Sequence, residues 1–69
     1  MSDRLQIDPN IHFGKPCVAG TRITVKNVLE LIRDGHHFHE IIADYYHVLT
    51  VDDIKACLQF VMDQVSAES

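Results

Sequence analysis

Four basic side chains in the first half of the chain are the residues best suited to bind another molecule. Residues 15–33 carry these four against the single acidic Glu30, a net charge of 4 − 1 = +3. Residues 34–69 carry Lys55 against seven carboxylates, a net charge of 1 − 7 = −6, so the overall charge of −4 hides a basic stretch. Such a stretch is either an ordinary solvated surface or a patch for an anionic or acidic partner. The candidate binding residues are Lys15, Arg22, Lys26 and Arg33.

Histidine and cysteine could bind a metal ion or act in catalysis, but their spacing favours neither role. His36, His37 and His39 are close in sequence, yet no Cys-x-x-Cys or His-x-x-x-His pair accompanies them. We interpret them as exposed or capping residues around a turn, with a metal site as the weaker alternative. Cys17 and Cys57 are predicted to be small buried hydrophobic residues. Because no phosphate loop or arranged carboxylate pair is present, we expect no enzymatic activity, no cofactor and no metal.

The length of 69 residues predicts a single domain, residues 1–69, with a marginal core. No apolar run approaches the ~20 residues of a transmembrane helix. The polar start, Met1-Ser2-Asp3-Arg4, leads into no apolar segment typical of a signal peptide. We therefore expect a cytoplasmic protein that makes no membrane contact.

The pattern of apolar residues and turn formers predicts a mainly α fold, with a short N-terminal strand or hairpin followed by three helices. Residues 4–23 are interrupted by Gly14, Pro16 and Gly20, and short alternating pieces such as Ile11–Phe13 indicate an extended and turn region. Gly20 should allow a tight turn with positive φ, which Thr21 can stabilise through its hydroxyl. Residues 24–66 are predicted to form a three-helix unit.

Helical periodicity places the first helix at about residues 25–34, with Thr24 as N-cap and Gly35 just beyond its end. A second helix is predicted at about 38–46, with a weak cap at His37 and an apolar stripe of Phe38, Ile41, Ile42 and Tyr45.

The third helix, at about 51–65, has the clearest start, because Thr50 and Asp53 are spaced as a variant capping box. Its apolar stripe comprises Ile54, Cys57, Leu58, Val61, Met62 and Val65.

The second and third predicted helices have the lengths of a helix-turn-helix unit. A DNA-reading helix should present Arg, Lys, Asn or Gln near its start, whereas Asp52 and Asp53 stand there. If the domain binds DNA, we therefore expect the basic stretch, and not the last helix, to make the contact.

The combination of a Gly-Lys-Pro element, a Gly-Thr-Arg element and a Leu-Thr-x-x-Asp-Ile box resembles the family called domain of unknown function 433, over about residues 5–62. The matching residues are Ile7-Asp8-Pro9, Gly14-Lys15-Pro16, Ala19-Gly20-Thr21-Arg22-Ile23, Val25, Gly35, Glu40-Ile41-Ile42, Tyr45-Tyr46, Leu49-Thr50 and Asp53-Ile54. The sequence departs from the family pattern at Thr24, His37, His39 and His47.

This resemblance implies a helix-turn-helix, homeodomain-like core and an antitoxin of a Vap-type type II toxin–antitoxin pair, whose partner is a PIN-like ribonuclease toxin. The structural motif residues that it implies are Gly14, Pro16, Gly20, Thr21, Gly35, Thr50 and Asp53. Two alternatives stay open: a stand-alone helix-turn-helix regulator that binds operator DNA, and a dimeric protein-interaction domain.

Arg22 has two possible roles. It either clamps a carboxylate within the fold, which is the commoner use of such an arginine, or it points at a partner. In the second case Arg22 or Lys15 would pair with the metal-binding carboxylates of a PIN-like active site.

The number of apolar residues also predicts a homodimer. Three apolar helix stripes, together with those of the first 23 residues, exceed what three short helices can cover. The additional apolar residues are Leu5, Ile7, Ile11, Phe13, Val18 and Ile23.

Overall fold

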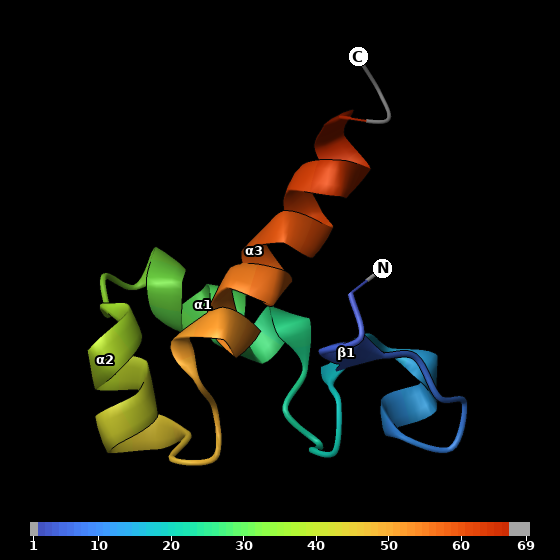
Figure 1. Ribbon diagram of the computed structural model, residues 1–69, viewed down its shortest axis with the longest axis horizontal. Helices are drawn as coiled ribbons and strands as arrows, with labels where there is room; N and C mark the ends of the chain where they lie inside the picture. The colour runs from blue at the N-terminus through green and yellow to red at the C-terminus, as the bar shows by residue number, and fades with distance from the viewer. Residues whose placement is uncertain (1, 67–69) are drawn as a thin grey trace.

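The first quarter of the chain forms a small antiparallel hairpin. In the computed structural model, which describes residues 2–66, β1 (Leu5–Gln6) pairs with β2 (Cys17–Val18), with Leu5 opposite Val18 (Figure 1). The chain then folds back along β2, because Cys17 also forms an isolated antiparallel bridge with Thr24. The prediction of a short N-terminal hairpin followed by helices is confirmed.

Between the two strands lies a left-handed turn, η1 (His12–Gly14), where an extended piece was predicted. His12, Phe13 and Gly14 have φ values of 48°, 57° and 82°. The alternation of Ile11 and Phe13 therefore does not reflect a strand, and Phe13 is 97% exposed. The turn part of the prediction for residues 4–23 holds here and the extended part does not, because the backbone is left-handed from His12 to Gly14.

The helix α1 (Val25–Arg33) has the ends that the sequence predicts. The Thr24 hydroxyl accepts a hydrogen bond from the Asn27 N–H at 3.0 Å. At the other end Gly35 has φ +96°, and the His36 N–H donates to the Leu31 carbonyl at 3.0 Å. Val25 and Val28 are buried, and Leu29 and Ile32 pack against the core.

The second helical segment differs from the prediction in its winding. A short α2 (Phe38–Glu40) continues into a π-helical turn, η2 (Ile41–Tyr45), where the Tyr46 N–H donates to the Ile41 carbonyl at 2.7 Å. This wider turn takes one extra residue. As a result Tyr46 packs against the core, whereas Tyr45, which was predicted to face inward, is 48% exposed.

The cap of this segment is also stronger than predicted. His37 lacks an ordinary capping side chain, but the Glu40 carboxylate accepts a hydrogen bond from the His37 N–H at 2.9 Å. This bond lowers the pKa of Glu40. The signal was the Glu three residues after the cap, which is the second half of a capping box.

The long helix α3 (Val51–Ser66) crosses the rest of the molecule, and its second half projects beyond it (Figure 1). The predicted capping box is confirmed: the Thr50 N–H donates to Asp53 Oδ2 at 2.9 Å, and the Asp53 N–H donates to Thr50 Oγ1 at 3.2 Å. None of the helices formed by residues 2–66 combines the length and apolar character that a membrane crossing requires.

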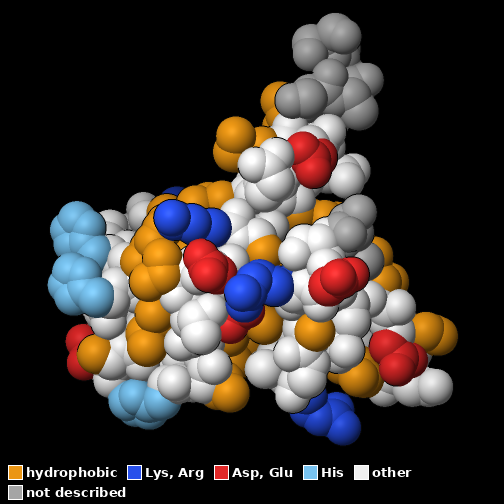
Figure 2. Space-filling view, in the orientation of Figure 1, with side chains coloured by type: hydrophobic (Ala, Val, Ile, Leu, Met, Phe, Trp, Pro, Cys, Tyr) orange, Lys and Arg blue, Asp and Glu red, His pale blue; other side chains and the backbone are white. Residues whose placement is uncertain are grey.

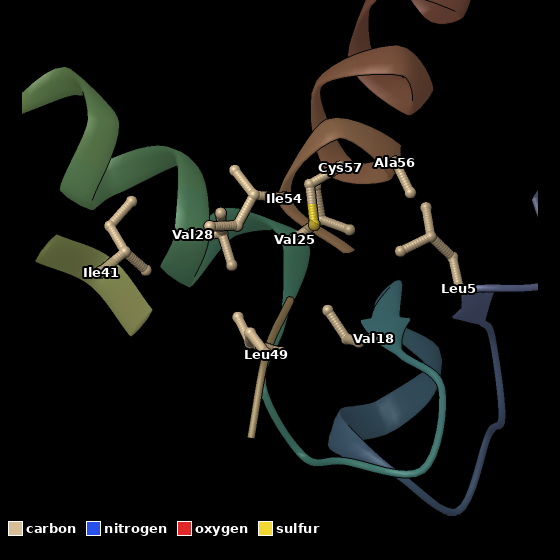
Figure 3. Close-up of a cluster of buried hydrophobic side chains, with 9 residues drawn as sticks. All are labelled: Leu5, Val18, Val25, Val28, Ile41, Leu49, Ile54, Ala56 and Cys57. Atoms are coloured by element: carbon tan, nitrogen blue, oxygen red, sulfur yellow. The ribbon is translucent and has the colours of Figure 1, made fainter. Parts of the chain in front are cut away.

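The core lies where the hairpin, α1, η2 and the first half of α3 meet (Figure 3). Its buried side chains are Leu5, Val18, Val25, Val28, Ile41, Leu49, Ile54, Ala56 and Cys57. Leu5 and Val18 were counted among the apolar side chains that three short helices could not all cover. The single chain nevertheless buries both of them.

Candidate functional site

The turn that carries Arg22 is fixed by its neighbours. It joins Val18 to Ile23, whose carbonyl accepts from the Val18 N–H at 2.9 Å, and Gly20 has the predicted positive φ of +79°. The Thr21 hydroxyl donates to the Val18 carbonyl at 2.8 Å and accepts from the Ile23 N–H at 3.0 Å. These bonds hold the backbone on both sides of Arg22, so the turn presents this side chain from a rigid base.

Arg22 itself is exposed and forms no ion pair with any residue in the 2–66 range. The alternative role considered for Arg22, clamping a carboxylate within the fold, belongs instead to Arg4. Its Nη1 lies 3.2 Å from Asp53 Oδ1, and its Nη2 lies 3.6 Å from Asp52 Oδ2.

Sequence reasoning missed Arg4, because 49 positions separate it from Asp53. The only available signal was indirect: two adjacent carboxylates at a helix start attract a basic residue from elsewhere. Arg4 and the helix start together tie the N-terminal segment to α3.

The three remaining candidate cations are exposed but do not gather around Arg22. The Val25 N–H donates to the Pro16 carbonyl at 2.9 Å, so Lys15 and Lys26, each one position beyond this bond, lie at the same end of the paired segment. Arg22 lies at the other end of this segment, on the turn that joins Val18 to Ile23. Arg33 lies at the last turn of α1, about 10 Å along the helix from Lys26.

The separation of these cations is visible on the surface as well. Arg33 is paired with its neighbour, with Nε 3.1 Å from Asp34 Oδ1. On the face drawn in Figure 2 the Lys and Arg side chains are apart from one another, and Asp and Glu side chains lie among them. A single acidic site on another molecule could therefore contact Arg22 or the Lys15–Lys26 end, but not all four cations at once.

Three of the histidines, His36, His37 and His39, lie in and just before α2, and Figure 2 shows His side chains gathered at one end of the molecule. His36, His37 and His39 line a shallow hollow of about 560 Å³ together with Ile32, Gly35 and Phe38. The Tyr45 hydroxyl lies 3.3 Å from His36 Nε2, and the rings of His37 and His39 are parallel at 5.9 Å. Across the described residues, no three His, Cys, Asp or Glu side chains are placed to hold a metal ion.

Both cysteines are buried, as predicted. Cys17 is 1% exposed and Cys57 is fully buried, and neither forms a disulfide. Burial, with a smaller effect of Asp53, raises the pKa of the Cys57 thiol to about 11. A thiol in this state is a poor nucleophile, because the thiolate is the reactive form.

Comparisons with known proteins place this fold in a family. A family model described as "Protein of unknown function (DUF433)" matches residues 5–61. The crystal structure of a DUF433 member protein from Anabaena variabilis ATCC 29413 is similar, with a TM-score of 0.79 and 26% sequence identity over 97% of this chain and 68% of that chain. No curated protein matches the sequence. Because the family model spans most of the chain, the protein belongs to the DUF433 family, whose function is unknown.

Proposed function

We propose that this protein is an antitoxin, a binding module that neutralises a PIN-like ribonuclease toxin through Arg22. The observation that carries the proposal is the Gly20–Arg22 turn. Its backbone is fixed by the Thr21 hydroxyl, and its arginine is exposed without an ion pair among residues 2–66. An exposed arginine on a rigid turn loses little conformational freedom of the backbone when it binds.

The chemistry of the two sites is complementary. A PIN-like active site is a cluster of carboxylates that binds a divalent metal ion. A guanidinium group can donate two parallel hydrogen bonds to one carboxylate, which gives both strength and geometric specificity. Arg22 placed in that cluster would compete with the metal ion and with the RNA.

Lys15 and Lys26 have a supporting role in this proposal. They lie at the other end of the paired segment from Arg22 and are exposed, so they would contact the acidic rim of the same nuclease and not its metal site. Charges at a rim mainly increase the association rate and contribute less to the affinity.

Operator DNA is the second candidate partner, because antitoxins of this type can repress their own operon. The exposed Lys and Arg residues would contact the phosphates. The start of α3 would not, because Asp52 and Asp53 lie there, paired with Arg4. The separation of the basic residues favours the nuclease over DNA as the main partner.

The test is co-expression with the product of the neighbouring reading frame, followed by co-purification and a growth assay. We expect the wild-type chain to co-purify and to protect the cells. Arg22→Ala should abolish protection, Arg22→Lys should restore part of it, and the matched control Lys55→Ala, at an exposed lysine of α3, should protect nearly as well as wild type.

Protection by Arg22→Ala at the wild-type level would refute the assignment of Arg22. A neighbouring product that neither binds the wild-type chain nor harms the cells would refute the antitoxin proposal. Because Arg22 is exposed, its replacement should leave the melting temperature nearly unchanged, which separates lost binding from lost folding.

A further inference from the structure

The projecting half of α3 carries apolar side chains that residues 2–66 leave uncovered. Met62 is 57% exposed and Val65 is 64% exposed. In Figure 1 this part of α3 extends away from α1 and the hairpin. The sequence places both residues in the same apolar stripe as the buried Ile54, so the helix continues its apolar pattern beyond the core.

The stripe is also wider than the core requires. Ile54 and Val61 lie on the side of α3 that faces the core, and Ile54 is fully buried. Leu58 and Val65, seven residues apart, lie on the adjoining flank together with Met62, because seven residues make nearly two full turns. The α3 flank thus comprises Leu58, Met62 and Val65.

The polar side chains of this half lie on the other side of the helix. Asp63 is the one charged residue between positions 56 and 66, and its carboxylate accepts a hydrogen bond from Gln59 Nε2 at 2.7 Å. A helical rotation of 100° per residue puts Asp63 well away from the α3 flank. A partner can therefore cover the flank without removing a charge from water.

We propose that the α3 flank binds a second copy of this chain, with the two α3 helices antiparallel about a two-fold axis. Leu58 and Val65 are equally distant from the midpoint between Val61 and Met62. A two-fold axis at that midpoint therefore places Leu58 opposite Val65 of the partner subunit. The flank is thus complementary to itself, which is the requirement for an isologous dimer.

The charges permit a second copy. Asp63 is turned away, and Lys55, which borders the flank, lies about 20 Å along the helices from Lys55 of the partner subunit in the antiparallel arrangement. The contact runs over about 10 Å of helix, from Leu58 to Val65, and is smaller than a standard interface of ~800 Å² per partner. We therefore expect a weak dimer whose population rises with concentration.

The dimer leaves the Arg22 turn free. Residues 19–22 lie at the lower edge of the molecule in Figure 1, and the projecting half of α3 lies at the upper edge. Each copy can therefore present its own Arg22, and loss of the dimer does not by itself remove the proposed nuclease contact.

Sedimentation equilibrium between about 10 µM and 1 mM tests the proposal. We expect the mass to rise with concentration from 7.9 kDa towards twice that value. The double variant Met62→Asp/Val65→Asp should remain monomeric over the whole range. The matched control Val48→Asp, at a side chain outside α3 that is 65% exposed, should dimerise like wild type.

Circular dichroism of the three proteins should show the same helical content, because all substituted side chains are exposed. A wild-type mass of 7.9 kDa at every concentration would overturn the proposal. A double variant that keeps its fold and dimerises as strongly as wild type would overturn it too, because the interface would then lie elsewhere.

Discussion

Two arginines of this chain occupy opposite situations. Arg4 pairs with the carboxylates of Asp52 and Asp53 at the start of α3. Asp53 also forms the capping box with Thr50. Arg22 lies on the Gly20–Arg22 turn, whose backbone is equally well held, but its side chain is exposed and forms no ion pair with residues 2–66.

The difference separates structural from functional charge. The carboxylates at the start of α3 are paired with Arg4, so substitutions of these residues should change the stability of the protein. The Gly20–Arg22 turn positions a charge that the described fold does not use, so Arg22 variants should change binding.

The largest effect is expected at Ile54, which is fully buried beneath the first turn of α3. Ile54→Ala should lower the free energy of unfolding by about 3 kcal/mol, through lost burial and the cavity left behind. Urea denaturation measures it, with Val65→Ala on the exposed half of α3 as the control, expected below about 0.5 kcal/mol at monomer concentrations. Equal losses in both variants would show that the two halves of α3 do not differ as described.

The next effect is expected at Asp53, which closes the capping box and receives Arg4. Asp53→Ala should cost about 1–2 kcal/mol of unfolding free energy, because a helix cap is lost. Thermal denaturation of wild type and variant at pH 7 measures the difference. A cost close to zero would mean that the start of α3 is not stabilised by this carboxylate.

The same residue predicts a pH dependence. Burial raises the pKa of Asp53, but hydrogen bonds from Thr50 and Arg4 outweigh it, so the pKa lies below its usual 3.8. The contribution of Asp53 is therefore complete above about pH 3.8 and is lost as the pH falls through the lowered value. The stability difference between wild type and Asp53→Ala should shrink as the pH falls below about 3.8, whereas a constant difference would contradict the lowered pKa.

A smaller effect is expected at Gly20, which shapes the turn beneath Arg22. Gly20→Ala should destabilise the protein by about 1 kcal/mol, because φ is +79° and an alanine side chain is strained there. No heavy atom beyond the two neighbouring residues lies within 4 Å of the added Cβ, so the cost comes from the backbone conformation. If Gly20→Ala proved as stable as wild type, the turn would not be held as described.

The smallest effect is expected at the two cysteines, which should not react with a thiol reagent in the native protein. Cys17 and Cys57 are buried, and the pKa of the Cys57 thiol is raised to about 11. A thiol reagent at pH 8 should modify neither cysteine in the native protein and both after denaturation. Rapid native labelling of Cys57 would show that the start of α3 opens readily.

The sequence was sufficient to predict features that depend on neighbouring residues. The Thr24 cap, the positive φ of Gly20 and Gly35, and the Thr50–Asp53 box each follow from side chains within a few positions. The order of a short hairpin followed by three helices followed from periodicity in the same way. The resemblance to the DUF433 family was likewise visible in short motifs at fixed spacing, and the family match confirms it.

The features that the sequence did not predict depend on long-range packing. The pairing of Arg4 with Asp53 joins segments 49 positions apart. Because of the π-helical turn, Tyr46 and not Tyr45 packs against the core. A regular period of 3.6 residues cannot reveal the extra residue that such a turn contains. The spread of the four candidate cations follows from how the hairpin and α1 meet, so a net charge of +3 over residues 15–33 overstated their clustering.

The most direct test of the division between the two arginines measures stability and affinity in the same pair of variants. Arg4→Ala should lower the free energy of unfolding by about 0.5–1 kcal/mol, because its ion pairs are partly exposed, and should bind the neighbouring nuclease with an affinity within twofold of wild type. Arg22→Ala should melt like wild type, and titration calorimetry should show binding at least tenfold weaker. Unchanged affinity in Arg22→Ala, or an affinity loss in Arg4→Ala as large as in Arg22→Ala, would contradict the account.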